Sequence, residues 1–356
     1  MLKTLLQSCL FAVALASCTS SYQPSISVAC EEKDAESSII KWETFPFMDG
    51  SLKVYASTNP NNIPLDNPIA TTRISEQKII ITTNDTEQRM YYTMIFDDEY
   101  PVTTASRNIW IPGTQNFRDI GGYPTHARKN VTWGKIYRSA QLDSVSQQGI
   151  KILKGLGIKT IIDLRDEDEH QEYSPCLKKL NIVNAPLHSK SMGQIFERVH
   201  SGELCNDSLR KALKLVNIEL IENNCKSLKK IFRTLLDPDN YPVVIECSTG
   251  KMRTGLVTAL LLSSLGVNYE LIVQDYELSN NYFNITRSCK YGYSLPENAQ
   301  EAITALYTSR GDYLDATYEY VTDKYESIDD YMNAKIGLSS KDIKQLRSIL
   351  LQKPEP

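Results

Sequence analysis

The sequence lacks three features that each mark a class of protein: a long apolar segment, an excess of basic residues and a metal-binding spacing of cysteines. Its strongest apolar run, residues 10–16, is far shorter than the roughly 20 residues that cross a bilayer, so no membrane-spanning helix is expected. Lys and Arg number 39 against 43 Asp and Glu, a balance that does not favour nucleic acid as a partner. The 8 cysteines show no metal-ligand spacing, and we expect neither a metal nor another cofactor.

Internal repeats and low-complexity tracts are also absent. With 41% hydrophobic and 23% charged residues the composition is that of a folded globular protein, which excludes wholesale disorder and fibrous classes. A chain of 356 residues is long for one domain, so we expect two hydrophobic cores.

The N-terminal segment has the plan of a secretory signal. Lys3 gives a short positive start, the apolar run follows, and small residues precede Cys18. The letters LASC at residues 15–18 resemble the lipobox of bacterial lipoproteins, in which the cysteine is lipidated and becomes the mature N-terminus. We therefore expect a signal peptide over residues 1–17, a linker over residues 18–24, and an exported protein of the cell envelope that acyl chains hold at a membrane. A plain cleaved signal is the alternative.

Short runs of alternating apolar and polar residues, separated by turn-like segments, fill residues 25–107. Ile40 with Trp42, and Leu52 with Val54, would face a core, because side chains along a strand alternate between its two faces. The spacing of the runs is typical of a small immunoglobulin-like or fibronectin type III-like β-sandwich. No ionisable cluster in it looks catalytic, so we interpret it as a spacer or docking module.

Residues 108–352 alternate between helices and strands, which predicts an α/β fold whose central sheet is flanked by helices. Helices are expected over residues 146–156 and 253–265, a long amphipathic stretch covers residues 207–236, and strands are expected over residues 158–164, 181–187 and 242–246. Ser339 and Asp342 have the spacing of a capping box, which predicts the start of the last helix.

The letters VVIECSTGKMRTG at residues 243–255 carry the chemistry. A buried strand ends at Cys247, a short loop follows, and a helix begins at Arg253. In that geometry the N–H groups of the loop and of the first helical turn converge and form a cradle for a tetrahedral dianion such as phosphate. The same field favours the Cys247 thiolate and makes it a nucleophile. An inert core thiol is the alternative interpretation of Cys247.

The remaining loop residues favour the same interpretation. Arg253 offers a planar fork that binds two phosphoryl oxygens and spreads the charge of a transition state. Gly250 permits the turn that aims the amides, Thr254 can donate its hydroxyl to the thiolate, and Lys251 would face the mouth of the site. The predicted phosphate-binding loop is completed by Ser248, Thr249 and Met252.

Cysteine, five residues and then Arg-Thr-Gly resembles the phosphate loop of cysteine-dependent phosphatases. Further motifs resemble the bacterial tyrosine-phosphatase family with the NFRD signature: NFRDIGGY at residues 116–123, GKIYRSA at 134–140, IDLR at 162–165 and DYELSN at 275–280. The resemblance does not include the predicted β-sandwich. It implies a cysteine-phosphatase-like fold, with substrates that are phosphotyrosine, sometimes phosphoserine or phosphothreonine, and sometimes phosphoinositides.

The resemblance also implies roles for individual residues. Cys247 would be the nucleophile, and Arg253 and Lys251 would bind the substrate phosphate. Asn116 and Arg118 would lie on a loop beside the cradle, where they bind substrate or shape the wall. An ion pair between Arg118 and its neighbour Asp119 that serves packing alone is the alternative.

Two positions depart from the family pattern, which commonly has His before the cysteine and Asp before the arginine. This sequence has Glu246 and Met252 there. The missing Asp is the proposed general acid of several members, so another group must protonate the leaving oxygen. The candidates are Asp163, Asp119, Asp275 and Glu246. We choose Asp163, because a carboxylate at a strand end can overhang the cradle, although an ion pair with Arg165 would give it a packing role. Glu246, adjacent to the nucleophile along a strand, should point to the opposite face.

Together these patterns predict an exported phosphomonoester hydrolase that acts through a phosphocysteine. Its substrate would be a phosphorylated protein or a small phosphomonoester, with phosphotyrosine or dual specificity. One alternative is a phosphatase of phosphoinositides or inositol phosphates, which Lys251 favours. Another is a lipoprotein that binds phosphorylated ligands without turnover, which Met252 and Glu246 favour.

Overall fold

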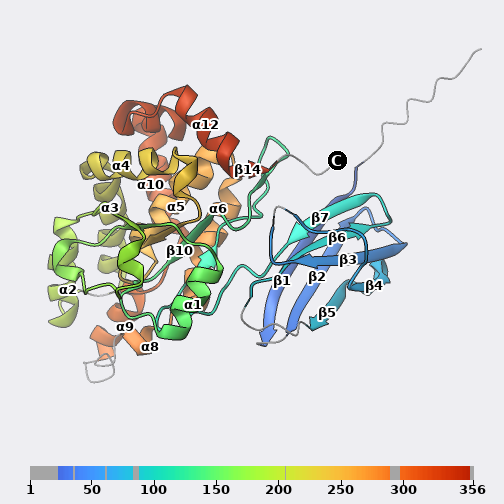
Figure 1. The fold of residues 1–356 in the computed structure, drawn as a ribbon. Coiled ribbons are helices and arrows are strands. Elements are labelled where there is room, and N and C mark those ends of the chain that lie inside the picture. Colours follow the sequence, from blue (N-terminus) through green and yellow to red (C-terminus); the bar gives the residue numbers. More distant parts are fainter. Residues whose placement is uncertain are drawn as a thin grey trace, which may run out of the picture.

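The structure, a computed structural model, describes residues 23–34, 37–60, 62–82, 88–204, 206–288 and 297–352. The predicted signal peptide, the predicted lipidation site at Cys18 and most of the predicted linker lie outside these residues. Within the described ranges no helix combines the length and the apolar character needed to cross a bilayer. Figure 1 shows a strand-rich part and a larger helix-rich part side by side.

The strand-rich part, here called the β domain, consists of two antiparallel sheets that share a core. Among the described residues one sheet has the order β1 (Ser25–Asp34), β2 (Ser37–Phe45), β5 (Lys78–Thr82), and the other has the order β4 (Ala70–Arg73), β3 (Ser51–Ser57), β6 (Tyr91–Phe96), β7 (Tyr100–Thr104). Ile40, Trp42, Leu52 and Val54 are all buried in this core, as the alternation predicts. Trp42 of β2 meets Phe96 of β6 edge-on, with ring centroids 6.2 Å apart, so the two sheets pack face to face.

The helix-rich part, here called the α/β domain, is built on a mixed sheet. Its strand order is β12 (Asn181–Asn184), β11 (Thr160–Asp163), β13 (Val243–Glu246), β10 (Ile136–Ser139), β8 (Arg118–Asp119). The strands β10 to β13 of this order run parallel, and β8 is antiparallel to β10. A small ladder joins β9 (Asn130–Val131) to β14 (Leu351–Gln352). This confirms a mixed α/β fold.

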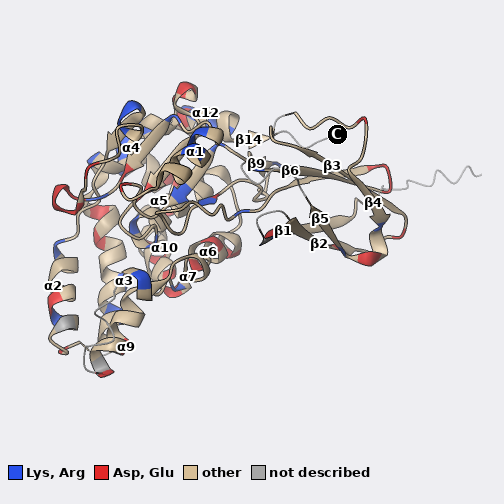
Figure 2. Cartoon of the chain, turned by 60° about the horizontal axis from the view of Figure 1, so that its bottom comes forward, with Lys and Arg blue, Asp and Glu red and all other residues tan. Residues whose placement is uncertain are grey.

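Helices cover both faces of the sheet. They are α1 (Gln147–Gly155), α2 (Lys190–His200), α3 (Asn206–Asn223), α4 (Cys225–Leu235), α5 (Met252–Leu265), α6 (Tyr269–Glu277), α7 (Ser279–Tyr282), α8 (Ile285–Ser288), α9 (Glu297–Leu306), α10 (Gly311–Tyr325), α11 (Ile328–Tyr331) and α12 (Ser340–Leu350), with short turns η1 (Ile74–Glu76), η2 (Glu167–Glu169), η3 (Leu177–Lys179), η4 (Pro238–Asn240) and η6 (Met332–Ile336). Ile161 and Val244 pack on the α1 side, whereas Ile162 and Val243 pack against α3, α4 and α5. Basic and acidic residues are interspersed along these helices (Figure 2), in keeping with the balanced composition.

The predicted amphipathic stretch over residues 207–236 is two helices rather than one. The side chain of Asn224 donates to the carbonyl oxygens of Leu220 and His188 and accepts from the His188 N–H, so it bonds to a neighbouring loop and separates α3 from α4. The last helix begins as its capping box predicts, since Ser339 and Asp342 exchange hydrogen bonds at the start of α12.

Candidate active site

The strand β13 lies in the middle of the α/β sheet and places Cys247 at the sheet's carboxyl edge. It is parallel to both neighbours, β10 and β11, so the ends of the three strands meet where open α/β sheets bind ligands. The loop after Cys247 leads directly into α5, with Lys251 at the N-cap position. The free N–H groups of the first turn of α5 are therefore available at this edge.

The shape of the loop depends on Gly250 and on two side chains outside it. Gly250 has φ +66°, and a Cβ there would lie 2.5 Å from neighbouring backbone, so only glycine fits. Nδ2 of Asn116 donates to the carbonyl oxygens of Thr249 (3.2 Å) and Gly250 (2.9 Å), and Arg138 donates to that of Gly250 (2.8 Å). Because these bonds hold the carbonyls outside the loop, its N–H groups are free to face inward.

Cys247 is 2% exposed, and its thiol is acidified. Burial raises the pKa of Cys247, but the Arg253 guanidinium, the nearby Thr254 hydroxyl and the N–H groups of Thr254 and Thr249 outweigh burial, so this pKa lies below its ordinary value. These surroundings are those of a nucleophilic thiolate rather than of an inert core thiol.

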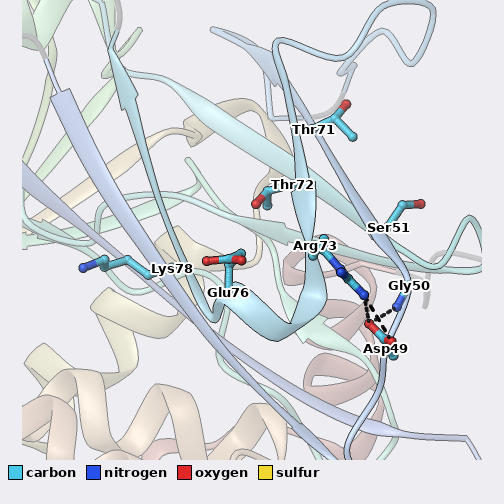
Figure 3. A pocket seen from close by; sticks show the side chains of 8 residues that line it. All are labelled: Asp49, Gly50, Ser51, Thr71, Thr72, Arg73, Glu76 and Lys78. Carbon is cyan, nitrogen blue, oxygen red and sulfur yellow. Dashed lines mark hydrogen bonds and ion pairs between the residues drawn. The ribbon is translucent and has the colours of Figure 1, made fainter.

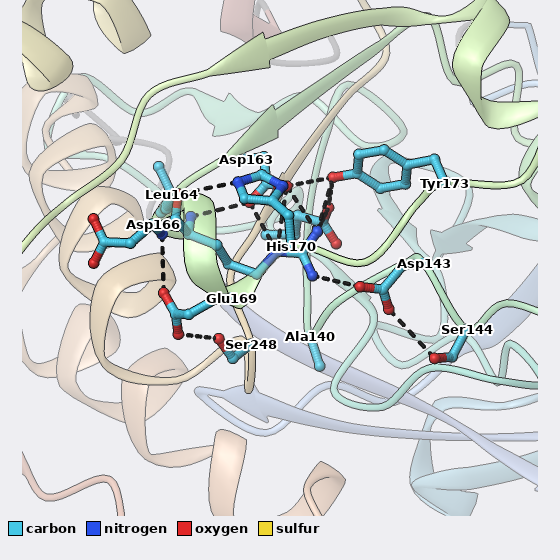
Figure 4. Close-up of polar contacts among 12 residues, drawn as sticks. Ala140, Asp143, Ser144, Asp163, Leu164, Asp166, Glu169, His170, Tyr173 and Ser248 are labelled. Carbon is cyan, nitrogen blue, oxygen red and sulfur yellow. Dashed lines mark hydrogen bonds and ion pairs between the residues drawn. The ribbon is translucent and has the colours of Figure 1, made fainter. Parts of the chain in front are cut away.

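Arg253 is held by Glu169 of η2, the short turn that follows β11. The two side chains form a bidentate ion pair, with NH1 to Oε2 at 2.5 Å and NH2 to Oε1 at 2.6 Å. Glu169 also accepts a hydrogen bond of 2.6 Å from the Ser248 hydroxyl (Figure 4). Burial raises the pKa of Glu169, but the contacts with Arg253 and Ser248 outweigh burial and bring this pKa down to about 2. The ionised carboxylate therefore fixes the plane of the guanidinium at the mouth of the loop.

The sequence reasoning missed Glu169. The available signal was the acidic run at residues 166–169, which directly follows a predicted strand whose carboxyl end lies at the same sheet edge as Cys247. A carboxylate in that run is within reach of any arginine that opens α5.

Behind the loop lies a buried cluster of Arg118, Arg138 and Asp275. Arg138 pairs with the Asp275 carboxylate at 2.6 Å, and Arg118 donates to the Asp275 carbonyl at 2.6 Å and to Oδ1 of Asn116. Burial raises the pKa of Asp275, but the two arginines lower it to about 2. Asn116 and Arg118 are 2% and 0% exposed, so in this structure they support the loop from behind rather than line an open wall.

Lys251 is 5% exposed and does not face an open mouth, contrary to expectation. Its Nζ donates to Oδ1 of Asn280 at 3.2 Å and lies 5.2 Å from the centroid of the Phe283 ring, which covers it. Burial, with the charges of Arg118 and Arg138, lowers the pKa of Lys251 to about 8.

Asp163, the residue chosen as proton donor, lies in an ion-pair network away from the loop. Its carboxylate accepts from Arg165 (2.8 Å) and Tyr173 (2.5 Å), and Arg165 also pairs with Asp143 at 2.6 Å (Figure 4). Burial raises the pKa of Asp163, but Arg165 and Tyr173 lower it below its ordinary value. A buried carboxylate kept ionised by its partners has no proton to donate, so this geometry fits the packing alternative.

The other candidate donors are occupied in similar ways. Asp119 pairs with Arg89 at 2.5 Å, and Asp275 pairs with Arg138. Burial, followed by the charge of Asp163, raises the pKa of Glu246 well above its ordinary value.

The carboxyl group of Glu246 points away from the loop. It accepts from the Tyr173 hydroxyl, which also contacts Asp163, and it lies 3.6 Å from the Arg165 guanidinium. Tyr173 packs in the core on the α1 side, whereas Cys247 packs in the core on the α5 side. Met252 is half-buried against the α5 core and offers no proton.

A cavity of about 420 Å³ opens over the loop. Ser248 and Thr249 line it together with Phe283 and Tyr307, whose rings stack with centroids 5.9 Å apart. Arg287 is the one Lys or Arg among the lining residues. The cavity has the size of a small-molecule site, with an aromatic wall beside the anion-binding loop. Among the described residues no group of three or more His, Cys, Asp or Glu could hold a metal ion.

Another hollow, of about 610 Å³, lies on the β domain (Figure 3). Its lining includes the ion pair of Arg73 and Asp49, whose side chains are 70% and 61% exposed, together with Glu76 and Lys78. Its charges balance and are solvated, so it lacks the buried charged and nucleophilic groups that mark the loop at Cys247.

Comparison with known proteins matches the α/β domain. The model of a family described as the tyrosine phosphatase family matches residues 109–352. The triple specificity protein phosphatase PtpB of Mycobacterium tuberculosis is 25% identical over 278 residues, which cover 68% of this chain and 98% of PtpB. A putative tyrosine-protein phosphatase of Cupriavidus necator is 26% identical over 241 residues, which cover 65% and 84%. The core catalytic domain of a PP-IP phosphatase from S. cerevisiae, solved with citrate, covers 62% of this chain and 96% of its own at 17% identity, with a TM-score of 0.31.

Proposed function

The chain belongs to the tyrosine phosphatase family, and on this premise we propose that it hydrolyses phosphomonoesters through a cysteinyl-phosphate on Cys247. The observation that carries the proposal is the meeting of an acidified thiol, a rigidly held Arg253 and inward-facing N–H groups at one loop. Such a site binds a phosphoryl group, supplies the nucleophile without a separate base, and stabilises the charge that develops.

The reaction has two steps. The Cys247 thiolate attacks phosphorus, the S–P bond forms, and the P–O bond to the leaving group breaks while that oxygen receives a proton. Water then attacks phosphorus, the S–P bond breaks, and phosphate leaves as the thiolate is restored. In both steps the loop N–H groups and the positive charge of Arg253 stabilise the equatorial oxygens.

The first experiment replaces the sulfur. Cys247→Ser keeps the shape of the loop but presents a hydroxyl that is not ionised at neutral pH, so turnover of an aryl phosphate should fall to background while phosphate binding persists. Steady-state rates and isothermal calorimetry with inorganic phosphate measure the two effects. Turnover that is unchanged in Cys247→Ser would refute the cysteinyl-phosphate mechanism.

We propose Asp166 as the donor of the leaving-group proton. It is partly exposed, it is the N-cap residue of η2, and it lies near Arg253. Its Oδ2 lies 3.2 Å from Nδ1 of His188, whose side chain is 59% exposed. Support also comes from the replacement of the family's loop aspartate by Met252 and from the occupied state of the buried carboxyls.

The dependence on the leaving group tests this donor. Asp166→Asn should slow phenyl phosphate, which needs a proton on departure, by roughly a hundredfold or more, and should slow an activated nitrophenyl ester much less. Asp168→Asn, in the same turn and exposed, is the matched control and should leave both rates unchanged. Equal losses on the two esters with Asp166→Asn would remove Asp166 from this role.

We propose a phosphotyrosine or dual-specificity substrate, in a phosphorylated protein or a small phosphomonoester. The stacked pair Phe283 and Tyr307 beside the loop supports a phenyl-bearing substrate, and PtpB bears the name of a triple specificity protein phosphatase. A phosphoinositide headgroup would call for several cations, and among the cavity's lining residues Arg287 is the one Lys or Arg. Faster turnover of phosphoinositides than of phosphotyrosine peptides by the purified protein would reverse this assignment.

The finer assignments rest on the sequence. We propose that the chain is a member of the bacterial branch with the NFRD signature, supported by the loop-holding contacts of Asn116 and Arg118. We propose that the β domain is an immunoglobulin-like or fibronectin type III-like sandwich, supported by its two packed antiparallel sheets.

We also propose that the chain is an exported lipoprotein anchored through Cys18, supported by the LASC segment. Labelling of the protein with a radioactive fatty acid should be lost in Cys18→Ala.

A further inference from the structure

The two domains meet at Arg89, which lies just before β6 of the β domain. Its NH1 donates to Oδ2 of Asp119 at 2.5 Å and to the Tyr91 hydroxyl at 2.9 Å, and its NH2 donates to the Ser106 carbonyl at 2.9 Å. The side chains of Arg89 and Asp119 are 7% and 0% exposed. This is a buried ion pair between a residue of the β domain and the aspartate of the NFRD segment.

Aromatic rings enclose the ion pair. The Arg89 guanidinium lies 4.6 Å from the ring centroid of Tyr91 on its own side, and 5.6 Å and 5.8 Å from those of Trp133 and Tyr137 on the α/β side. Tyr91 and Trp133 share a small core across the junction. The rings exclude water and stabilise the cation, so the contact is a rigid one.

Asp119 links Arg89 to two turns of the α/β domain. Besides Arg89, its carboxylate accepts from the N–H groups of Gly121 and Gly134, each at 2.7 Å. Asp119 belongs to β8, which pairs with β10. One carboxylate therefore joins the β domain, the turn after β8 and the turn before β10.

From β8 the contacts lead to the phosphate loop. Arg118, the residue before Asp119, donates to Oδ1 of Asn116, and Nδ2 of Asn116 holds the carbonyls of Thr249 and Gly250. Arg138 of β10 holds the Gly250 carbonyl from the same side. A displacement of β8 would move the groups that turn the loop N–H groups inward.

We propose that Arg89 is a positioning residue for the phosphate loop, so that the β domain supports the active site and is more than a spacer or docking module. The inference rests on the proposed function for its kinetic readout. The family match begins at residue 109, so Arg89 lies outside the segment shared with the family. Without Arg89, the buried Asp119 carboxylate keeps its two N–H donors but loses its ion-pair partner, which strains β8 and the loop it supports.

The experiment compares two arginines of the β domain in the full-length chain. Arg89→Met removes the buried pair, and Arg73→Met removes the solvated pair with Asp49 (Figure 3) and serves as the control. For each variant, a thermal melt reports folding, kinetics on an aryl phosphate report kcat and KM, and the pH dependence of alkylation at the Cys247 peptide reports the pKa of that thiol.

If Arg89→Met still melts cooperatively, its kcat/KM should fall by roughly ten- to a hundredfold, mostly through kcat. The reason is that the displaced N–H groups of the phosphate loop stabilise the transition state less. The pKa of Cys247 should rise, since the same N–H groups stabilise the thiolate. Arg73→Met should match the wild type. Arg89→Lys, which restores the charge but not the fork, should recover part of both effects.

A folded Arg89→Met with kcat/KM within about twofold of the wild type and an unchanged Cys247 pKa would overturn the proposal. If Arg89→Met does not fold, Arg89→Lys is judged by the same criteria. A rise of the Cys247 pKa in Arg89→Lys would support the proposal, and an unchanged Cys247 pKa would contradict it. If the wild type shows no turnover, the proposed function fails, while the alkylation profiles still decide whether Arg89 positions the loop.

Discussion

Lys251 lies in the phosphate loop, but its surroundings disfavour its positive charge. It belongs to the phosphate loop, where a cation attracts a dianion, yet it is covered by Phe283 and lies near Arg118 and Arg138. Burial and these like charges bring its pKa down to about 8, so in the free enzyme the ammonium is lost just above neutral pH. A bound phosphate dianion would favour the charged form again.

The pH profile should therefore have a basic limb that belongs to the free enzyme. As pH rises through about 8, Lys251 loses its proton, phosphate binding weakens, and kcat/KM should fall while kcat changes less. Lys251→Arg keeps the charge at every accessible pH and should move this limb upward, whereas Lys251→Met should lower kcat/KM at all pH values. An unshifted limb in Lys251→Arg would assign it to another group.

At the scale of elements, the phosphate loop is a turn between β13 and α5 that outside side chains keep open. Asn116 and Arg138 hold its carbonyls, and the positive φ of Gly250 lets it pass close to the end of β10. The short η2 adds the carboxylate that orients Arg253. The active conformation of the loop is thus a property of four elements that meet at one sheet edge.

Gly250→Ala tests this packing. The new methyl would lie 2.5 Å from the backbone at Ser139 and Ala140, and its residue would keep φ +66°, so we expect a loss of about 1–3 kcal/mol in unfolding free energy. Activity should fall further than stability, because the loop N–H groups move. Gly155→Ala is the control, since nothing lies within 4 Å of its added methyl. Denaturant unfolding and kcat/KM measure both; a fully active Gly250→Ala would contradict the model of the loop.

At the scale of the whole molecule, ion pairs join elements that are far apart in the sequence. Glu169 binds Arg253, Asp275 binds Arg138, and Asp119 binds Arg89 across the two domains. Each pair closes a long stretch of chain, and the pairs of Asp275 and Asp119, which are buried, would leave a costly buried charge if one partner were neutralised. The integrity of the molecule is therefore linked to the ionisation of a few carboxylates.

This linkage predicts a steep loss of stability in acid. Glu169 and Asp275 have folded pKa values of about 2, below their ordinary values of 4.5 and 3.8, so their contribution is complete above those ordinary values and is lost as pH falls toward 2. The melting temperature should fall steeply over that interval. Glu169→Gln, which has no charge to lose, should be less stable at neutral pH but less sensitive to acid. Parallel pH curves for the two proteins would contradict the linkage.

The class of fold and the chemical centre could be predicted from the amino-acid sequence alone. Period-two alternation placed Ile40, Trp42, Leu52 and Val54 in the β core, because local patterns report which face of an element is buried. The spacing from Cys247 to Arg253 between a strand and a helix predicted the loop, because its geometry depends on a few adjacent residues. The separation of α3 from α4 was not predictable in this way, since Asn224 bonds to a distant loop.

Which side chains support that centre became clear from the three-dimensional fold. Asp163 was expected at the cradle and instead pairs with Arg165, while Glu169, which follows it in the chain, holds Arg253. Arg89, from a domain interpreted from the sequence as a spacer or docking module, reaches Asp119. The physical reason is that partners of buried charges are chosen by the register of strands and the docking of domains, which bring together residues that no local pattern connects.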